Sequence, residues 1–149
     1  GANVIFNDIK EDLKKNSEYR TKEEVIRDSD LIILSCTYDF GDKEIIGFKE
    51  ISYAKNEQLI VNIARGGVIK EEALYEGIVS GKIKGYATDV LIQEDTNESI
   101  SSSKLIKLIE EGFNVIITPH IGGVSHEAMR ETEYIIANKF KEYLINERI

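Results

Sequence analysis

Short apolar runs of strand type recur along the chain and are separated by segments of helical pattern. The runs are Asn3–Phe6, Leu31–Leu34, Leu59–Ile63, Gly85–Leu91 and Asn114–Ile117. Runs of this length, rich in β-branched and other apolar residues, are typical of β-strands. The run LIIL at Leu31–Leu34 is apolar on both of its faces, which predicts a sheet covered by helices on two sides.

Helices are predicted between these strands and after the last one. Thr21 and Glu24 match a capping box ahead of a helix that ends near Asp28. Further helices are predicted at residues 45–54, at Glu71–Val79 with Gly81 closing the helix, and at residues 104–110.

The last predicted helix is the longest, and Ser125 is placed to cap it. Its apolar side chains fall on one side of the helix: Met129, Ile136, Phe140 and Leu144. Strands that alternate with helices require parallel crossovers, so the expected fold class is α/β with a doubly wound parallel sheet.

Composition narrows the range of functions. The chain has 149 residues, of which 42% are apolar and 31% charged, and this is typical of one ordinary globular domain. Its net charge of −8 disfavours nucleic acid and anionic membranes as partners. With one cysteine, Cys36, no long apolar run and no signal-peptide pattern at the start, we expect a cytoplasmic protein. One Cys and two His are too few for a zinc site, so no metal is expected.

Asp8 directly follows the first predicted strand. A carboxylate at the tip of a parallel strand can accept two hydrogen bonds from a ribose diol. Its charge would repel a 2′-phosphate, so Asp8 favours NAD over NADP if a dinucleotide binds. The alternative is an ordinary turn aspartate, because Asp is common in turns.

Arg65 stands where the apolar run VNIA meets two glycines, Gly66 and Gly67. In open α/β sheets, ligands bind beyond the carboxyl ends of the strands, and this position directs the arginine to that side. A guanidinium there can clamp a carboxylate through two parallel hydrogen bonds. The alternative is a surface arginine in an ion pair.

Asp89 lies near the end of the predicted strand Gly85–Leu91, Glu94 comes after that strand, and His120 comes after the last predicted strand. Histidine is the side chain whose ordinary charge change falls near neutral pH, and a carboxylate near His120 would favour its imidazolium form, as a general acid and base needs. Alternatively, Asp89 and Glu94 are solvated loop residues, and His120 is a strand-end residue whose ring forms hydrogen bonds with backbone groups. Because Arg65, Glu94 and His120 each come just after a predicted parallel strand, we expect them to converge at one edge of the sheet.

Three blocks resemble, in order, the signatures of the D-isomer-specific 2-hydroxyacid dehydrogenase family in its NAD-binding domain: VNIARGGVIKEEAL, GKIKGYATDVLIQE and NVIITPHIGG. The resemblance runs from ANVIFND through the helix after HIGG. It implies a Rossmann-like fold, NAD as cofactor and a small 2-keto or 2-hydroxy acid as substrate. It also implies hydride transfer between the substrate C2 and the nicotinamide.

The resemblance also implies roles for individual residues. Arg65 would bind the substrate carboxylate and keto oxygen, His120 would exchange the proton, and Glu94 would pair with His120 to tune it. The residues implied for cofactor binding are Asp8 at the adenosine ribose, Cys36 and Thr37 beside the adenine, and Ile63, Ala64, Asp89 and Gly122 toward the nicotinamide. Without the resemblance, Cys36 could line a cofactor pocket, but a small cysteine of this kind more often serves packing alone.

The chain departs from the family pattern at several points. Asp95 stands where Pro usually follows the catalytic Glu, and Thr37 stands where Pro often follows the third strand. No G-x-G-x-x-G motif occurs, and the strand and helix that should carry it would lie before Gly1. We therefore interpret residues 1–149 as a partial NAD-binding domain, with the first strand, first helix and substrate domain missing.

This interpretation has two consequences. In the usual strand order 3-2-1-4-5-6 the missing strand is central, so we expect the gap to be filled by another chain segment, a partner copy in a homodimer, or rearranged pairing. We also expect negligible dehydrogenase activity from these residues alone. An alternative function on the same domain is a non-catalytic NAD sensor or corepressor-like scaffold, which would have no need of an acid–base pair.

Overall fold

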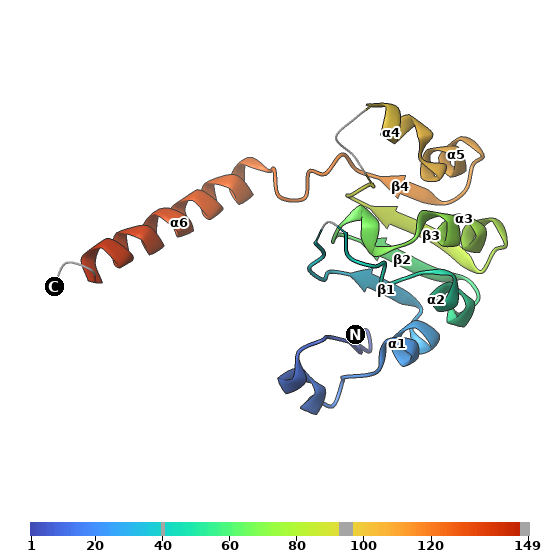
Figure 1. The fold of residues 1–149 in the computed structure, drawn as a ribbon, viewed down its shortest axis with the longest axis horizontal. Coiled ribbons are helices and arrows are strands. Elements are labelled where there is room, and N and C mark those ends of the chain that lie inside the picture. Colours follow the sequence, from blue (N-terminus) through green and yellow to red (C-terminus); the bar gives the residue numbers. More distant parts are fainter. Residues whose placement is uncertain (40, 93–96, 147–149) are drawn as a thin grey trace. The chain divides into compact units, whose positions relative to one another are not determined.

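The computed structural model describes residues 1–39, 41–92 and 97–146 (Figure 1). The chain divides into two compact units, Gly1–Ile117 and Thr118–Ile149. The first holds the sheet and the core, and the second holds a loop and one long helix.

The first unit is built on a four-stranded parallel sheet. Its strands, in the order β1-β2-β3-β4, are β1 (Leu31–Leu34), β2 (Gln58–Asn62), β3 (Ile83–Thr88) and β4 (Val115–Ile117). The predicted parallel α/β architecture is therefore confirmed. The predicted bounds of the first of these strands match β1, whereas β2 starts one residue earlier than predicted and β3 ends before Asp89.

The first unit has helices at the predicted positions and further short ones that were not predicted. The helices near predicted positions are α1 (Lys22–Asp28), α2 (Phe48–Tyr53), α3 (Glu71–Val79) and α5 (Lys104–Glu110), and the additional ones are η1 (Glu11–Lys15), η2 (Gly66–Val68) and α4 (Asn97–Ser102). The bounds predicted for α3 and α5 are confirmed, whereas α2 is shorter than predicted and α4 was not predicted.

Local capping explains where several helices begin and end. The Thr21 hydroxyl accepts a hydrogen bond from Glu24 N at 3.3 Å, and Glu24 Oε2 accepts one from Thr21 N at 2.9 Å, so the predicted capping box is confirmed. After α3, Gly81 has a φ of +78°, a left-handed conformation that glycine adopts without steric cost. Glu71, at the start of α3, accepts from Ser103 Oγ at 2.9 Å and from Lys104 N at 2.7 Å, which ties α3 to α5.

The core lies on one face of the sheet. Ile60, Leu74, Ile83 and Leu108 are among its most buried side chains, contributed by β2, α3, β3 and α5. Strands joined in sequential order by right-handed crossovers place all their connecting helices on the same face.

The opposite face of the sheet differs from the expectation for LIIL. Leu31 and Ile33 of β1 are 47% and 57% exposed, so the described residues cover β1 on one face only. The register aligns Ile33 with Val61, Ala87 and Ile116 in one apolar row across the four strands. The reason is the strand order, because the crossovers of this sheet all return on the core side.

The N-terminal segment does not form the predicted strand Asn3–Phe6. Phe6 makes an isolated parallel bridge with Tyr19, supported by hydrogen bonds from Phe6 N to Glu18 O and from Arg20 N to Phe6 O. Among the described residues, β1 pairs with β2 only, so the predicted gap is not closed by rearranged pairing. An isolated pair of extended segments is marginally stable without a third strand or a helix packed against it, which is the physical reason that no regular strand forms here.

The second unit consists of the loop from Thr118 and helix α6 (His126–Asn146). Ser125 Oγ accepts a hydrogen bond from Ala128 N at 3.1 Å, so the predicted cap is confirmed. No residue of α6 is buried. In the described part of the chain, no helix has the length and apolar character needed to cross a lipid bilayer.

Candidate active site

An open cleft of about 370 Å³ lies at the carboxyl ends of β1 and β2. Two loops form its walls, Ser35–Asp39 after β1 and Ile63–Arg65 after β2. The parallel register pairs Leu34 with Asn62, so the loops leave the sheet side by side. The lining residues are Ser35, Cys36, Thr37, Tyr38, Asp39, Ile63, Ala64 and Arg65.

Five of these residues are ones that the sequence singled out. Cys36, Thr37, Ile63 and Ala64 were expected at the cofactor, and Arg65 at the substrate. The structure brings them together in one cleft, although nothing in their sequence spacing places residue 36 beside residue 64. Such clefts beyond the carboxyl ends of parallel strands are where open α/β sheets bind ligands.

Arg65 provides the positive charge of the cleft. Its side chain is exposed, and Nη1 donates a hydrogen bond to the Ala64 carbonyl at 2.7 Å. A guanidinium has five N–H donors in a planar fork, which leaves donor capacity for a ligand after this bond. Carboxylates and phosphates match that fork in a bidentate way.

Sequence reasoning did not identify Tyr38 as part of this cleft. Its hydroxyl donates to the Asp42 carbonyl at 2.6 Å. Its ring lies against Gly67, where a Cβ atom would be only 2.7 Å from Tyr38 Cε1. Tyr38 is thus a half-buried wall of the cleft, and its close approach to the loop depends on the absence of a side chain at Gly67. That pair was the only signal in the sequence that a bulky group approaches this loop.

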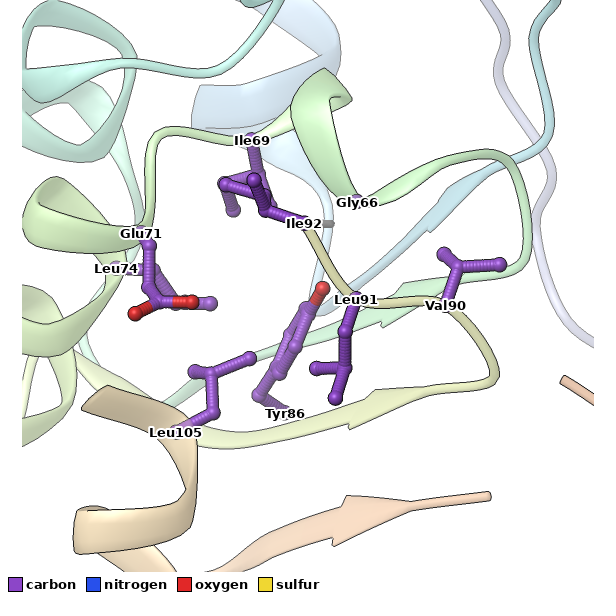
Figure 2. Close-up of a pocket in the computed structure, with 9 residues that line it drawn as sticks. All are labelled: Gly66, Ile69, Glu71, Leu74, Tyr86, Val90, Leu91, Ile92 and Leu105. Carbon is purple, nitrogen blue, oxygen red and sulfur yellow. The ribbon is translucent and has the colours of Figure 1, made fainter. Parts of the chain in front are cut away.

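A second, much smaller pocket has Gly66 in its lining (Figure 2). Its volume is about 10 Å³, which is room for about one water molecule. It is lined by residues of the β2–α3 connection, α3, β3, the loop after β3 and α5: Gly66, Ile69, Glu71, Leu74, Tyr86, Val90, Leu91, Ile92 and Leu105. A space of this size is a small packing gap between the β2–α3 connection and the loop after β3, too small for an organic ligand.

Tyr86 is the titratable residue most affected by this packing. Burial raises the pKa of its phenol above the ordinary value of 10.0, and hydrogen bonding with Thr88 and Asn62 opposes that rise. The phenol therefore stays neutral at physiological pH. Thr88 and Asn62, at the ends of β3 and β2, provide hydrogen-bonding partners for the buried Tyr86 hydroxyl.

Two other predicted cofactor residues of the first unit are not among those that line the cleft. Asp8 is half-buried, and its Oδ1 accepts a hydrogen bond from Lys10 N at 2.9 Å, which is a local turn interaction. Asp89 follows the end of β3, and its backbone N donates to the Asn62 carbonyl at 3.2 Å. Their roles toward a cofactor stay predictions.

The remaining predicted residues are not placed relative to the cleft. Glu94 lies outside the described residues. His120 and Gly122 belong to the second unit, so the convergence of Arg65, Glu94 and His120 stays a prediction. His120 is exposed, and its φ of +52° is in the left-handed region that few residues other than glycine adopt. Such conformations cluster at functional sites.

Comparison with known proteins identifies the family. Residues 1–122 match the family model described as D-isomer specific 2-hydroxyacid dehydrogenase, NAD binding domain. The chain is 36% identical over 140 residues to a hydroxypyruvate reductase of Thermotoga maritima, covering 93% of this chain and 44% of that protein. It is 31% identical over 148 residues to a D-3-phosphoglycerate dehydrogenase of Haemophilus influenzae, covering 98% and 35%. The chain thus spans less than half the length of these relatives.

Solved structures agree with the sequence relatives. A D-lactate dehydrogenase from Sporolactobacillus sp. superposes with a TM-score of 0.77 at 31% identity, over 93% of this chain and 44% of that one. A D-lactate dehydrogenase from Aquifex aeolicus, complexed with NAD and lactic acid, superposes with a TM-score of 0.69 at 27% identity, over 96% and 46%. The fold and the family model point to the same assignment: this chain belongs to the D-isomer-specific 2-hydroxyacid dehydrogenase family, and its residues 1–122 match the NAD-binding domain of that family.

Proposed function

We propose that this chain is the cofactor-binding part of an NAD-dependent oxidoreductase that interconverts D-2-hydroxy acids and 2-keto acids. The observation that carries the proposal is the cleft between the loops after β1 and β2, which gathers Cys36, Thr37, Ile63, Ala64 and Arg65. The relatives are more than twice as long as the matched region. We therefore propose that the active enzyme also contains a substrate domain outside these 149 residues.

The residues of the cleft fit part of a dinucleotide. A volume of about 370 Å³ is within the range of small-molecule sites, and the lining combines apolar surface at Ile63 and Ala64 with hydroxyls at Ser35 and Thr37. Cys36 and Thr37 would hold the adenine end, and Ile63 and Ala64 would lie toward the nicotinamide. NAD(H), when bound, supplies or accepts the hydride at the substrate C2.

Arg65 would bind the substrate and polarise its reacting carbonyl. A 2-keto acid presents a carboxylate and a neighbouring keto oxygen, and the arginine fork can donate to both. Negative charge develops on the keto oxygen as hydride arrives, so a fixed guanidinium stabilises the transition state more than the ground state. Its bond to the Ala64 carbonyl restrains the side chain before the substrate binds.

His120 would exchange the proton. During reduction its imidazolium form protonates the developing alkoxide, and during oxidation the neutral form removes the hydroxyl proton. Glu94 would hold the imidazole and favour its protonated form. The left-handed backbone of His120 supports a functional role, because strain of this kind persists where the surrounding structure requires it.

The test uses the protein expressed from the complete reading frame. NADH oxidation is measured with a panel of 2-keto acids, and NADH binding is measured separately by fluorescence. We expect turnover by the wild type and a loss of kcat of about 10²–10⁴-fold in His120→Asn, with NADH binding largely retained. His126→Asn, the other histidine of the chain, is the matched control and should retain wild-type turnover.

Two outcomes would contradict the proposal. Unchanged turnover in His120→Asn would remove this residue as the proton donor. A wild-type protein that binds NADH but reduces none of the 2-keto acids would favour the non-catalytic sensor instead.

A further inference from the structure

Two polar residues end otherwise apolar strands of the sheet. Asn62 is the last residue of β2 and Thr88 the last residue of β3, and the two are paired in the parallel register. Their exposed fractions are 0% and 4%. Polar side chains this deeply buried are costly unless every hydrogen-bonding group has a partner, so their contacts decide what they do.

Asn62 uses both ends of its side-chain amide on the Arg65 loop. Its Oδ1 accepts a hydrogen bond from Ala64 N at 3.0 Å, and its Nδ2 donates to the Arg65 carbonyl at 2.9 Å. The two bonds close a tight turn from the end of β2 to Arg65. They fix the backbone from which the guanidinium projects.

The backbone carbonyl of Asn62 holds the neighbouring loop. It accepts from Thr88 Oγ1 at 3.1 Å and from Asp89 N at 3.2 Å. The single proton of the Thr88 hydroxyl is shared with the Val90 carbonyl, which lies 2.7 Å away, and the hydroxyl oxygen accepts from Val90 N at 3.1 Å. The end of β3, which leads to Asp89, is therefore tied to the same residue that holds Arg65.

Backbone packing reinforces this connection. A Cβ atom at Gly66 would lie 2.2 Å from Leu91 C and 2.3 Å from Ile92 N, so the two loops touch through their main chains. Movement of one loop must displace the other. Asn62 and Thr88, with the bonds described above, form a buried junction between the two loops.

We propose that Asn62 and Thr88 are positioning residues that place Arg65 and Asp89 for substrate and cofactor without touching either ligand. This inference rests on the proposed function, since it assumes that Arg65 binds the 2-keto acid. It extends that function because it states that the buried Asn62 amide and Thr88 hydroxyl hold Arg65 in position.

A second buried amide provides a matched control. Gln58 is the first residue of β2, at the opposite end of the strand, and is 1% exposed. Its Nε2 donates to the carbonyls of Ile26 at 2.8 Å and Ser29 at 2.6 Å, which are at the end of α1. Gln58→Glu removes a buried donor from the same strand and leaves the junction intact.

The first measurement is hydrogen exchange in the protein expressed from the complete reading frame. In Thr88→Val, we expect amide exchange to rise about tenfold in residues 63–69 as well as in residues 88–92, as the loss of one hydrogen bond implies. Thr88→Ser keeps the hydroxyl and should retain wild-type exchange in both segments. Gln58→Glu should change exchange near α1 and not in these loops.

The second measurement is the kinetics of 2-keto acid reduction. Asn62→Asp keeps the acceptor for Ala64 N but replaces the donor to the Arg65 carbonyl, so we expect kcat/KM to fall about 10–100-fold. Thr88→Val should also lower kcat/KM, and Thr88→Ser should restore kcat/KM to the wild-type value. If Asn62→Asp does not fold, the Thr88 pair decides the kinetic result.

A double-mutant cycle separates positioning from loss of stability. If Asn62 acts through Arg65, Asn62→Asp costs much less in an Arg65→Lys background than in the wild type, because the two changes share one interaction. Losses that multiply would overturn the proposal, as would a kcat/KM in Gln58→Glu that falls as far as in Thr88→Val. Exchange that rises in one loop only would also overturn it. If exchange rises in both loops of Thr88→Val but the wild type reduces no 2-keto acid, the result contradicts the proposed function and still supports the junction.

Discussion

Single residues determine how closely the loops at the carboxyl edge of the sheet approach one another. Gly66 has no positive φ that would demand glycine, and its requirement is purely steric, because a side chain would meet the Leu91–Ile92 backbone. Gly67 is needed for a different contact, with the Tyr38 ring. The sequence showed the pair of glycines beside Arg65, but not which groups they make room for.

We predict that Gly66→Ala destabilises the protein by about 1–3 kcal/mol, since the methyl group would force apart two backbone segments that cannot rotate away. The free energy of unfolding in urea measures this effect. Gly123→Ala is the control, because a Cβ there meets nothing within 4 Å, and it should stay within about 0.5 kcal/mol of the wild type. Equal stabilities for the two variants would contradict the packing described for Gly66.

At the scale of elements, local chemistry sets most helix boundaries. The capping box begins α1, and Gly81 follows the end of α3. Both were predicted because capping depends on residues a few positions apart. The segment from Asn3 to Phe6 was predicted wrongly as a strand, because a strand needs a partner and composition does not supply one.

The capping box predicts a pH dependence of stability. Hydrogen bonds from the Thr21 side chain and then its backbone lower the pKa of Glu24 below the ordinary value of 4.5. A carboxyl whose pKa is lower in the folded state stabilises the fold above its unfolded pKa, and that contribution is lost as the pH falls through the folded value. The stability advantage of the wild type over Glu24→Gln should therefore be present above pH 4.5 and shrink below it.

Urea unfolding of both proteins across this pH range measures the difference. Glu23→Gln, on the same first turn of α1 but outside the capping box, is the control for the loss of one negative charge. A stability difference between wild type and Glu24→Gln that grows in acid would contradict the sign of the linkage.

At the scale of the whole molecule, buried apolar surface is unevenly distributed. The buried apolar cluster lies within Gly1–Ile117, whereas α6 has no buried residue. The row Ile33, Val61, Ala87 and Ile116 leaves one face of the sheet apolar where the described residues do not bury it. Assembly as a homodimer, a cytoplasmic location and the filling of the edge beside β1 stay predictions.

We predict that, in the 149-residue chain, the amides of α6 exchange with solvent much faster than those of β2 and α3. Packing supplies most of the stability of helices in proteins, and a helix without buried residues has only its own hydrogen bonds. Hydrogen exchange followed by mass spectrometry compares the three segments directly. Protection of α6 equal to that of β2 would show that this helix has a stabilising partner.

The sequence by itself determined the parallel α/β class, most helices and the family resemblance, because these depend on periodicity, caps and motifs within short stretches. It also identified Arg65 at a strand end. Only the tertiary structure decided that Ser35–Asp39 faces Ile63–Arg65 across a cleft, and that Asn62 joins two loops. The physical reason is that these relations depend on the register of β1, β2 and β3, which is set by packing between segments far apart in the chain.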